Sequence, residues 1–251
     1  LTPLLPPDIA AFFGPESSLA VAGAQQETGA MNLSQLAIRT DGLEVTGTAA
    51  LAANGLPDRF DLTVRAGGKD APLRLPLPGA PVALGSATAD LRFDRSEDDS
   101  WRLTADVSEL SLPDLALETL RLEGSGRINH GARPSAGGHI RARATGMEWT
   151  DPAMAQAVGP AMALAGVFHW NDGAPLALRN LTIGAQNYDL LAQMDLSLRG
   201  AEPIVSGNIR ADVPDLSALS GVLGRETTGG ANATLSGRYA PLSGAGEVEA
   251  D

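Results

Sequence analysis

Cysteine is absent from this chain of 251 residues, which excludes disulfide bonds and any chemistry that requires a thiolate. Aromatic residues make up only 4 %, and most apolar residues are Ala, Leu and Val, so a closed core would lack the bulky side chains that usually fill one. No stretch reaches the apolar length of a membrane-spanning helix. Acidic residues outnumber basic ones, and the net charge of -12 argues against nucleic acid as a partner.

Motifs for catalysis or metal binding do not stand out either. His130, His139 and His169 are not spaced as metal ligands. The acidic run from Glu97 to Asp99 lacks the glycine and the ligand spacing of a calcium loop, and a solvated hairpin tip explains it better. We therefore expect no enzymatic activity, no cofactor and no metal site.

The chain instead repeats its own pattern. Residues 7–66 align without a gap with residues 152–211, an offset of 145 positions. This echo predicts a duplicated module, with residues 1–150 as the first copy and residues 151–251 as a truncated second copy that continues from it. Identical residues in the two copies include Pro7 and Pro152, Gly14 and Gly159, Leu33 and Leu178, Leu36 and Leu181, Ile38 and Ile183, and Arg65 and Arg210.

Strict alternation of apolar and polar residues dominates both copies. It is clearest over residues 59–66, 86–93, 101–107, 139–144 and 192–199. Because successive side chains of a strand point to opposite faces, the pattern predicts strands with one apolar and one solvated face, which is typical of antiparallel sheets. Turn residues separate these strands at short spacing, and three prolines between positions 76 and 81 predict a bend or a sheet edge.

Three short helices are expected between the strand runs, over residues 7–14, 151–159 and 214–224. The first two begin with a proline beside an acidic residue and end with a glycine followed by a proline. Each is too short to be stable alone in water, so its apolar side must pack against the sheet. We expect this of Ile9, Phe12, Phe13, Met154, Val158, Leu216, Leu219 and Leu223.

Several segments of the chain have similar strand-and-turn sequence patterns, namely residues 112–124, 151–160, 176–183 and 213–219. In these segments the chain resembles the TamB family within the AsmA-like superfamily. TamB is the inner-membrane component of the translocation and assembly module. The resemblance implies a mainly β fold, in which a long antiparallel sheet curls into an open U-shaped groove (a β-taco) with an apolar inner face.

The same resemblance implies a setting in the bacterial envelope. Members are periplasmic, are anchored in the inner membrane, and work with an outer-membrane partner of the Omp85 type, similar to TamA. Lipid movement, outer-membrane biogenesis and protein secretion are the roles that it implies. We expect this chain to be an internal fragment, whose contacts with a TamA-like partner and with the inner membrane run through other parts of the full-length protein.

One apolar face per strand must be hidden, either by a second sheet or by something supplied from outside. Alternation alone favours a closed sandwich, whereas the resemblance favours an open groove. Many inward positions are Ala or Gly, which would leave voids in a sandwich core but room for acyl chains in a groove. The lipid-binding residues are then expected to be Phe60, Leu62, Val64, Leu91, Phe93, Trp101, Leu103, Val107, Ile140, Met194, Leu196 and Ile209.

On this hypothesis the chain is a non-enzymatic bridge whose groove carries phospholipid acyl chains between the inner and outer membranes. Two alternatives stay open. The groove could chaperone strands of outer-membrane proteins or autotransporters, or the chain could be a structural β-repeat stalk or adhesin without a ligand.

Overall fold

The structure is a computed structural model that describes residues 17–67, 72–75, 82–131, 133–197, 203–240 and 245–250. The helix expected over residues 7–14 and the proline-rich bend at 76–81 lie outside these ranges.

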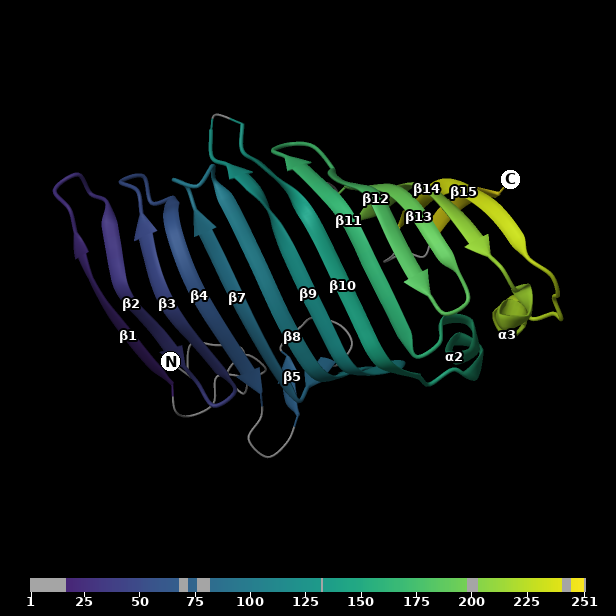
Figure 1. The fold of residues 1–251 in the computed structure, drawn as a ribbon. Helices are drawn as coiled ribbons and strands as arrows, with labels where there is room; N and C mark the ends of the chain where they lie inside the picture. Colours follow the sequence, from purple (N-terminus) through teal and green to yellow (C-terminus); the bar gives the residue numbers. More distant parts are fainter. Residues whose placement is uncertain are drawn as a thin grey trace. The chain divides into compact units, whose positions relative to one another are not determined.

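The described chain forms one long antiparallel sheet of 16 strands, which is not closed into a barrel (Figure 1). The expected mainly β fold with a few short helices is thereby confirmed, and the closed sandwich is wrong, because the described strands all belong to this one sheet. The strands are β1 Ser18–Gln25, β2 Met31–Arg39, β3 Leu43–Leu51, β4 Pro57–Gly67, β5 Leu73–Leu75, β6 Val82–Leu84, β7 Ser86–Asp94, β8 Ser100–Leu112, β9 Leu115–Asn129, β10 Ser135–Trp149, β11 Ala161–Asn171, β12 Leu176–Ala185, β13 Asp189–Ser197, β14 Ile204–Val213, β15 Ala231–Ala240 and β16 Ala245–Ala250.

The chain divides into two compact units, residues 1–125 and 126–251, and the strands of the two units follow the same order. An offset of 145 residues carries the bounds of β1 to β4 to 163–170, 176–184, 188–196 and 202–212. The observed strands β11 to β14 begin and end within two residues of these positions. The arrangement is therefore repeat-like at the level of strands, while the boundary at residue 150 stays a prediction.

Strand register repeats as well. Leu19 of β1 lies opposite Ile38 of β2, and their counterparts at the 145-residue offset, Leu164 and Ile183, lie opposite each other in β11 and β12. A β-bulge interrupts β2 between Leu33 and Leu36, and the same interruption falls between Leu178 and Leu181 in β12. An extra residue at such a bulge resets the alternation, so that leucines three positions apart point to the same face.

The two units differ after their fourth strand. In the first unit, the link from β4 to β7 contains the small hairpin β5–β6, and β6 pairs with β8. In the second unit, the link from β14 to β15 contains the 3₁₀ helix η2 (Leu216–Leu219) and the helical turn α3 (Ser220–Leu223). The fourth strand also pairs differently, since Val64 lies opposite Val45 whereas Ile209 lies opposite Ala192.

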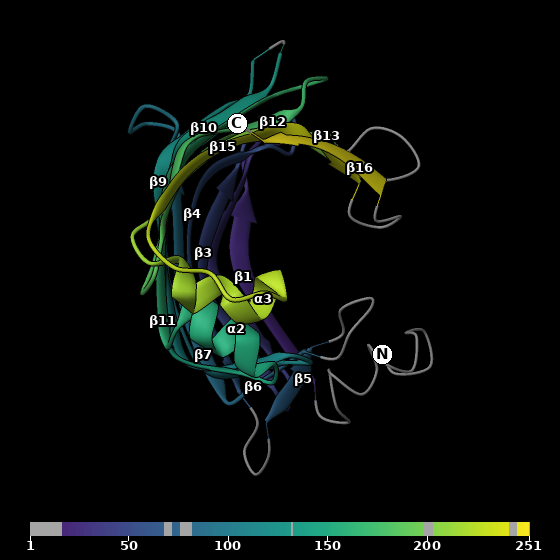
Figure 2. The ribbon, with the colours of Figure 1, turned by 90° about the vertical axis from the view of Figure 1, so that its right-hand side faces the viewer.

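Helix α2 (Pro152–Val158) forms where the sequence predicts it. The Asp151 side chain accepts a hydrogen bond from the Ala153 N–H, and Gly159 ends the helix with a φ of 81°. Val158 is buried, as expected. Figure 2 shows α2 and α3 on the inner side of the bend in the second unit's strands.

Leu223 does not pack against the sheet as expected, and 48 % of it is exposed. The expected helix over residues 214–224 is broken instead into η2 and a single turn, α3. Val222 and Leu223 of α3 are both exposed, while Ala218 of η2 is buried.

Close packing of the first unit's sheet depends on Gly47. Its φ of 156° directs an added Cβ at the carbonyl oxygen of Asp61 on the neighbouring strand β4. We expect Gly47→Ala to lower the free energy of unfolding by about 2 kcal/mol or more. Gly55→Ala is the control: its φ is 80° but nothing lies within 4 Å, so only the conformational strain of about 1 kcal/mol should appear. Urea unfolding measures both, and equal losses would contradict the packing argument.

Candidate functional site

Rows of apolar side chains run across β2, β3, β4, β7 and β8 in the first unit. Within each row the residues lie opposite one another on paired strands, so their side chains share one side of the sheet. We call this surface the first apolar face. Its rows are Leu33, Ala49, Phe60, Phe93 and Trp101; Leu36, Gly47, Leu62, Leu91 and Leu103; Ile38, Val45, Val64, Ala89 and Ala105; and Leu43, Ala66, Ala87 and Val107.

A bulge extends this face along β8. Glu109 has a φ of 54°, and the Gly85 N–H donates to the carbonyl oxygens of both Ser108 and Glu109. Before the bulge the half-buried apolar residues of β8 are odd-numbered, and after it they are Leu110 and Leu112. The extra residue therefore keeps the apolar side chains on one side of a strand of 13 residues.

The first apolar face is only partly buried. Its predicted lining residues are half-buried, with the exception of Phe93, which is 0 % exposed. Phe93 lies between Phe60 and Trp101, and its ring centroid is 5.6 Å from that of Phe60. Phe93 thus forms the packed floor of the face, while Leu62, Val64 and their neighbours keep apolar surface in contact with solvent. Within the described ranges, no second sheet lies over them.

Small residues make part of this face shallow. The third and fourth rows contain Ala89 and Ala105, and Ala66 and Ala87, next to the leucines of the second row. Gly47 contributes no side chain to the second row. The third and fourth rows therefore carry smaller apolar side chains than the second row, which contains Leu62, Leu91 and Leu103.

The second unit carries an equivalent surface, the second apolar face. It contains the other four predicted residues, Ile140, Met194, Leu196 and Ile209, and all four are half-buried. Its rows on β12 to β15 are Leu176, Leu196, Val205 and Tyr239; Leu178, Met194, Gly207 and Gly237; Leu181, Ala192, Ile209 and Leu235; and Ile183, Leu190, Ala211 and Ala233. Ala142 and Leu164 continue the last row onto β10 and β11, and Ile140 lies two residues from Ala142 on the same side.

One end of the second apolar face is covered by its own helices. Met147 of β10, Val158 of α2 and Val213 of β14 are buried there, and α2 contacts both β10 and η2. Gly146, with a φ of 63°, is the extra residue that turns Met147 to the same side as Ala144. The helices therefore cover one end of this face, while Ile140, Met194, Leu196 and Ile209 stay half-buried.

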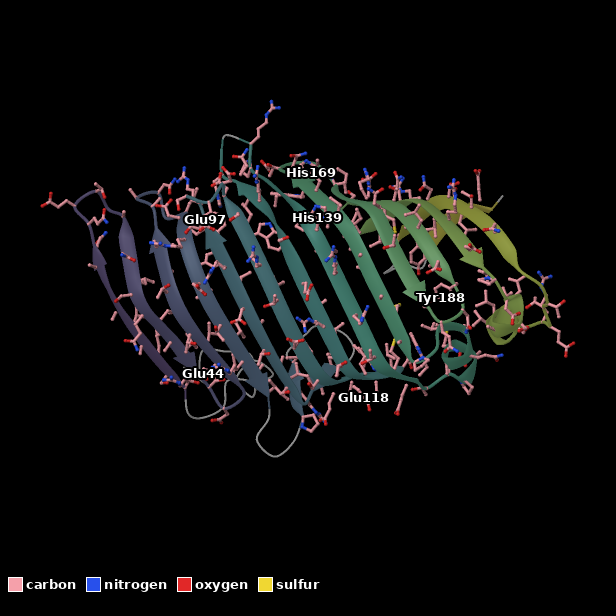
Figure 3. The ribbon with its side chains drawn as sticks, viewed as in Figure 1. Glu44, Glu97, Glu118, His139, His169 and Tyr188 are labelled. Atoms are coloured by element: carbon pink, nitrogen blue, oxygen red, sulfur yellow. The ribbon has the colours of Figure 1, made fainter. Side chains whose placement is uncertain are left out.

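The opposite side of the first unit is charged and well solvated. Glu44 accepts a hydrogen bond of 2.7 Å from the Nε of Arg39 and lies 3.8 Å from a guanidinium nitrogen of Arg65. Figure 3 labels Glu44 among the polar side chains of β3. Asp61 accepts hydrogen bonds from Arg92, which raise the pKa of that guanidinium. Such exposed ion pairs add little stability, but they show that this side of the sheet faces solvent.

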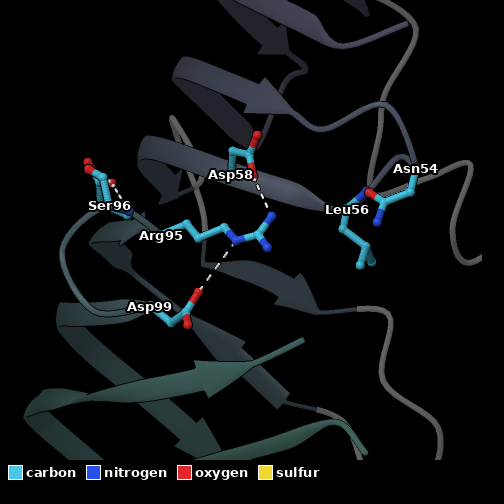
Figure 4. Close-up of polar contacts among 7 residues, drawn as sticks. Asn54, Leu56, Asp58, Arg95, Ser96 and Asp99 are labelled. Atoms are coloured by element: carbon cyan, nitrogen blue, oxygen red, sulfur yellow. Dashed lines mark hydrogen bonds and ion pairs between the residues drawn. The ribbon is translucent and has the colours of Figure 1, made fainter. Parts of the chain in front are cut away.

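Polar contacts also mark one end of the first apolar face. Arg95 donates to Asp58 at 3.0 Å and lies 3.9 Å from Asp99, as Figure 4 shows. A shallow hollow near these residues is lined by both polar and apolar side chains, including Met31, Leu51, Arg59 and Asp94. The row that contains Phe60 and Phe93 thus lies beside a charged border next to the β7–β8 turn.

Sequence reasoning missed part of the first apolar face, namely Leu33, Leu36 and Ile38 on β2. Strict alternation does not identify them, because the bulge separates Leu33 from Leu36 by three positions. The signal that could have found them is the 145-residue echo, in which Leu178, Leu181 and Ile183 repeat the same spacing.

Other kinds of site find no support in the residues that the structure describes. They contain no cluster of three or more His, Asp or Glu side chains able to hold a metal ion, and no helix long and apolar enough to cross a bilayer. Comparisons of the chain with protein-family models, with curated proteins and with solved structures found no match.

Two truncations test whether the first apolar face is only partly buried. Phe93→Ala removes a fully buried ring and should cost about 3–5 kcal/mol of unfolding free energy. Leu103→Ala removes a half-buried side chain and should cost roughly 1–2 kcal/mol, because less of its surface leaves water on folding. Urea unfolding followed by circular dichroism gives both values. A loss for Leu103→Ala as large as that for Phe93→Ala would mean that a second layer covers the face.

The charged border gives a pH prediction. Hydrogen bonds from the Ser96 side chain (2.6 Å) and from its backbone N–H (2.8 Å) hold the pKa of Asp94 below its ordinary value. Ser96→Ala removes the larger of these contributions, so the pKa of Asp94 should rise toward 3.8 while the backbone bond keeps it from reaching that value. Carbon-13 NMR titration of the Asp94 carboxylate measures this change, and an unchanged pKa would contradict the assignment.

Proposed function

We propose that the apolar faces bind the acyl chains of phospholipids, and that the protein moves or shelters lipid without catalysing a reaction. The observation that carries this proposal is the continuous row of half-buried leucines, Leu36, Leu62, Leu91 and Leu103, each of which keeps part of its surface in solvent. A continuous apolar surface that stays partly exposed often marks the site of a ligand or partner.

The free energy of exposing an acyl chain to water supports the apolar face as the lipid-binding surface. Each methylene kept from water is worth about 0.8 kcal/mol, so a sixteen-carbon tail costs roughly 12 kcal/mol to leave wet. An apolar surface that accepts the tail offsets most of that cost, while the headgroup stays in solvent. Rows that run from strand to strand allow a tail to shift along the sheet without passing a charged side chain, which would restore a barrier of a few kcal/mol.

The wider setting belongs to the same proposal. A TamB-like protein of the periplasm, linked to the inner membrane and to an Omp85-type partner by other parts of the full-length chain, would use such faces as a path for phospholipid between the two membranes. The absence of thiols and the lack of metal-ligand spacing in the sequence agree with a binding role rather than catalysis.

The test compares two neighbouring residues of β4 that point to opposite sides of the sheet. Val64→Asp places a carboxylate in the middle of the first apolar face, and Arg65→Glu reverses a charge on the solvated side. We expect Val64→Asp to reduce bound phospholipid about tenfold or more. A tail bound along the face would have to bury the new carboxylate or dissociate from the face. Arg65→Glu should leave loading unchanged.

Native mass spectrometry after incubation with phosphatidylethanolamine vesicles measures lipid per protein, and circular dichroism checks that both variants are folded. Equal loading of the two variants would overturn the assignment of the face. A protein that takes up no lipid, yet binds unfolded outer-membrane protein through the same face, would favour the chaperone function instead.

A further inference from the structure

The strand β1 ends the sheet of the first unit with an edge that carries no charge. All eight of its residues are exposed, with Leu19 at 68 % and Val21 at 52 %, and among the described residues it pairs with β2 alone. We propose that the free edge of β1 is an interaction surface for an antiparallel strand of the β10 type, supplied by a further copy of the same module. This inference goes beyond lipid binding and does not depend on it.

Edge composition supports the proposal. Free strand edges are normally protected by charged residues, proline or bulges, because their unpaired N–H and C=O groups recruit other strands. The strand at the other end of the sheet, β16, carries the exposed Glu247 and Glu249. Residues 18–25 carry no charged residue and no proline. A long, uncharged apolar edge of this kind is expected to be covered in the working protein.

The second unit shows what covers the equivalent edge. The counterpart of β1 at the 145-residue offset is β11, which pairs with β12 on one side and with β10 on the other. Both β1 and β11 meet their following strand in the same register, as the pairs Leu19–Ile38 and Leu164–Ile183 show. The free edge of β1 therefore corresponds to the edge of β11 that β10 occupies.

Register defines the chemistry of the partner strand. In the second unit, Ala142 lies opposite Leu164 and Arg141 lies opposite Ala165. Transposed by 145 positions, a strand of the β10 type would place its Ala142 equivalent beside Leu19 and its Arg141 equivalent beside Ala20. The partner is thus a strand with small apolar residues on one side and arginines on the other. A second folded copy of this chain does not offer such a strand, because its own β10 is already paired with β11.

Opposite charges at Ala20 test this register. The probe is a synthetic peptide of residues 135–149, added to the whole protein, with a scrambled peptide as control. Ala20 is exposed and lies on the polar side of β1, so its substitution leaves the first apolar face intact. We expect the peptide to slow hydrogen exchange of the β1 amides. Ala20→Glu should tighten binding about two- to fivefold by facing Arg141, and Ala20→Lys should weaken it by a similar factor.

Two results would overturn the proposal. One is equal binding of the scrambled peptide or of the two Ala20 variants, which would indicate unspecific adsorption rather than strand pairing. The other is protection of β1 that rises with protein concentration alone, which light scattering would attribute to association between copies of the chain. Lipid loading of the Ala20 variants should stay normal, so a failure here is distinguishable from a failure of the lipid-binding proposal.

Discussion

The two-residue period of the β-strand, held in phase from one strand to the next, is the constraint on which the rest of this structure depends. A shift of one residue in any strand would turn its charged side chains onto the apolar side. The chain avoids this by placing extra residues at defined points, as at Asn180 of β12, where φ is 48°, and at Glu109 of β8. The bulges therefore preserve the separation of an apolar side from a charged one over strands of up to 15 residues.

Within the described ranges the sheet has no second layer of strands, which is the usual source of stability for such a surface. Apolar side chains instead have neighbours in the same row, as Phe93 has in Phe60 and Trp101. Small residues such as Ala87 and Ala89 bring little apolar area with them, so they limit what remains exposed. The proposed acyl-chain ligand suits such a surface, because a flexible tail can adapt its torsions to side chains of different size.

The sequence predicted the strands well and their environment poorly, for a physical reason. Alternation reports the side to which a residue points, and the residues from Phe60 to Ala66 do alternate as expected. It does not report what lies above that side, and on pattern alone a closed sandwich was the better choice. The full burial of Phe93 and the exposure of Leu223 depend on neighbours distant in sequence and on helix length, which composition does not encode. The helix α2 was predictable because its start and end signals are local.

Duplication links the apolar faces to the edges of the sheet. The 145-residue offset reproduces both the strand order and the register within each unit, as the pairs Leu19–Ile38 and Leu164–Ile183 show. The two edges of the described sheet differ in charge, since β16 carries Glu247 and Glu249 while β1 carries no charged residue. The net charge of -12 favours repulsion between molecules in solution, whereas residues 18–25 of β1 contribute no charge to it.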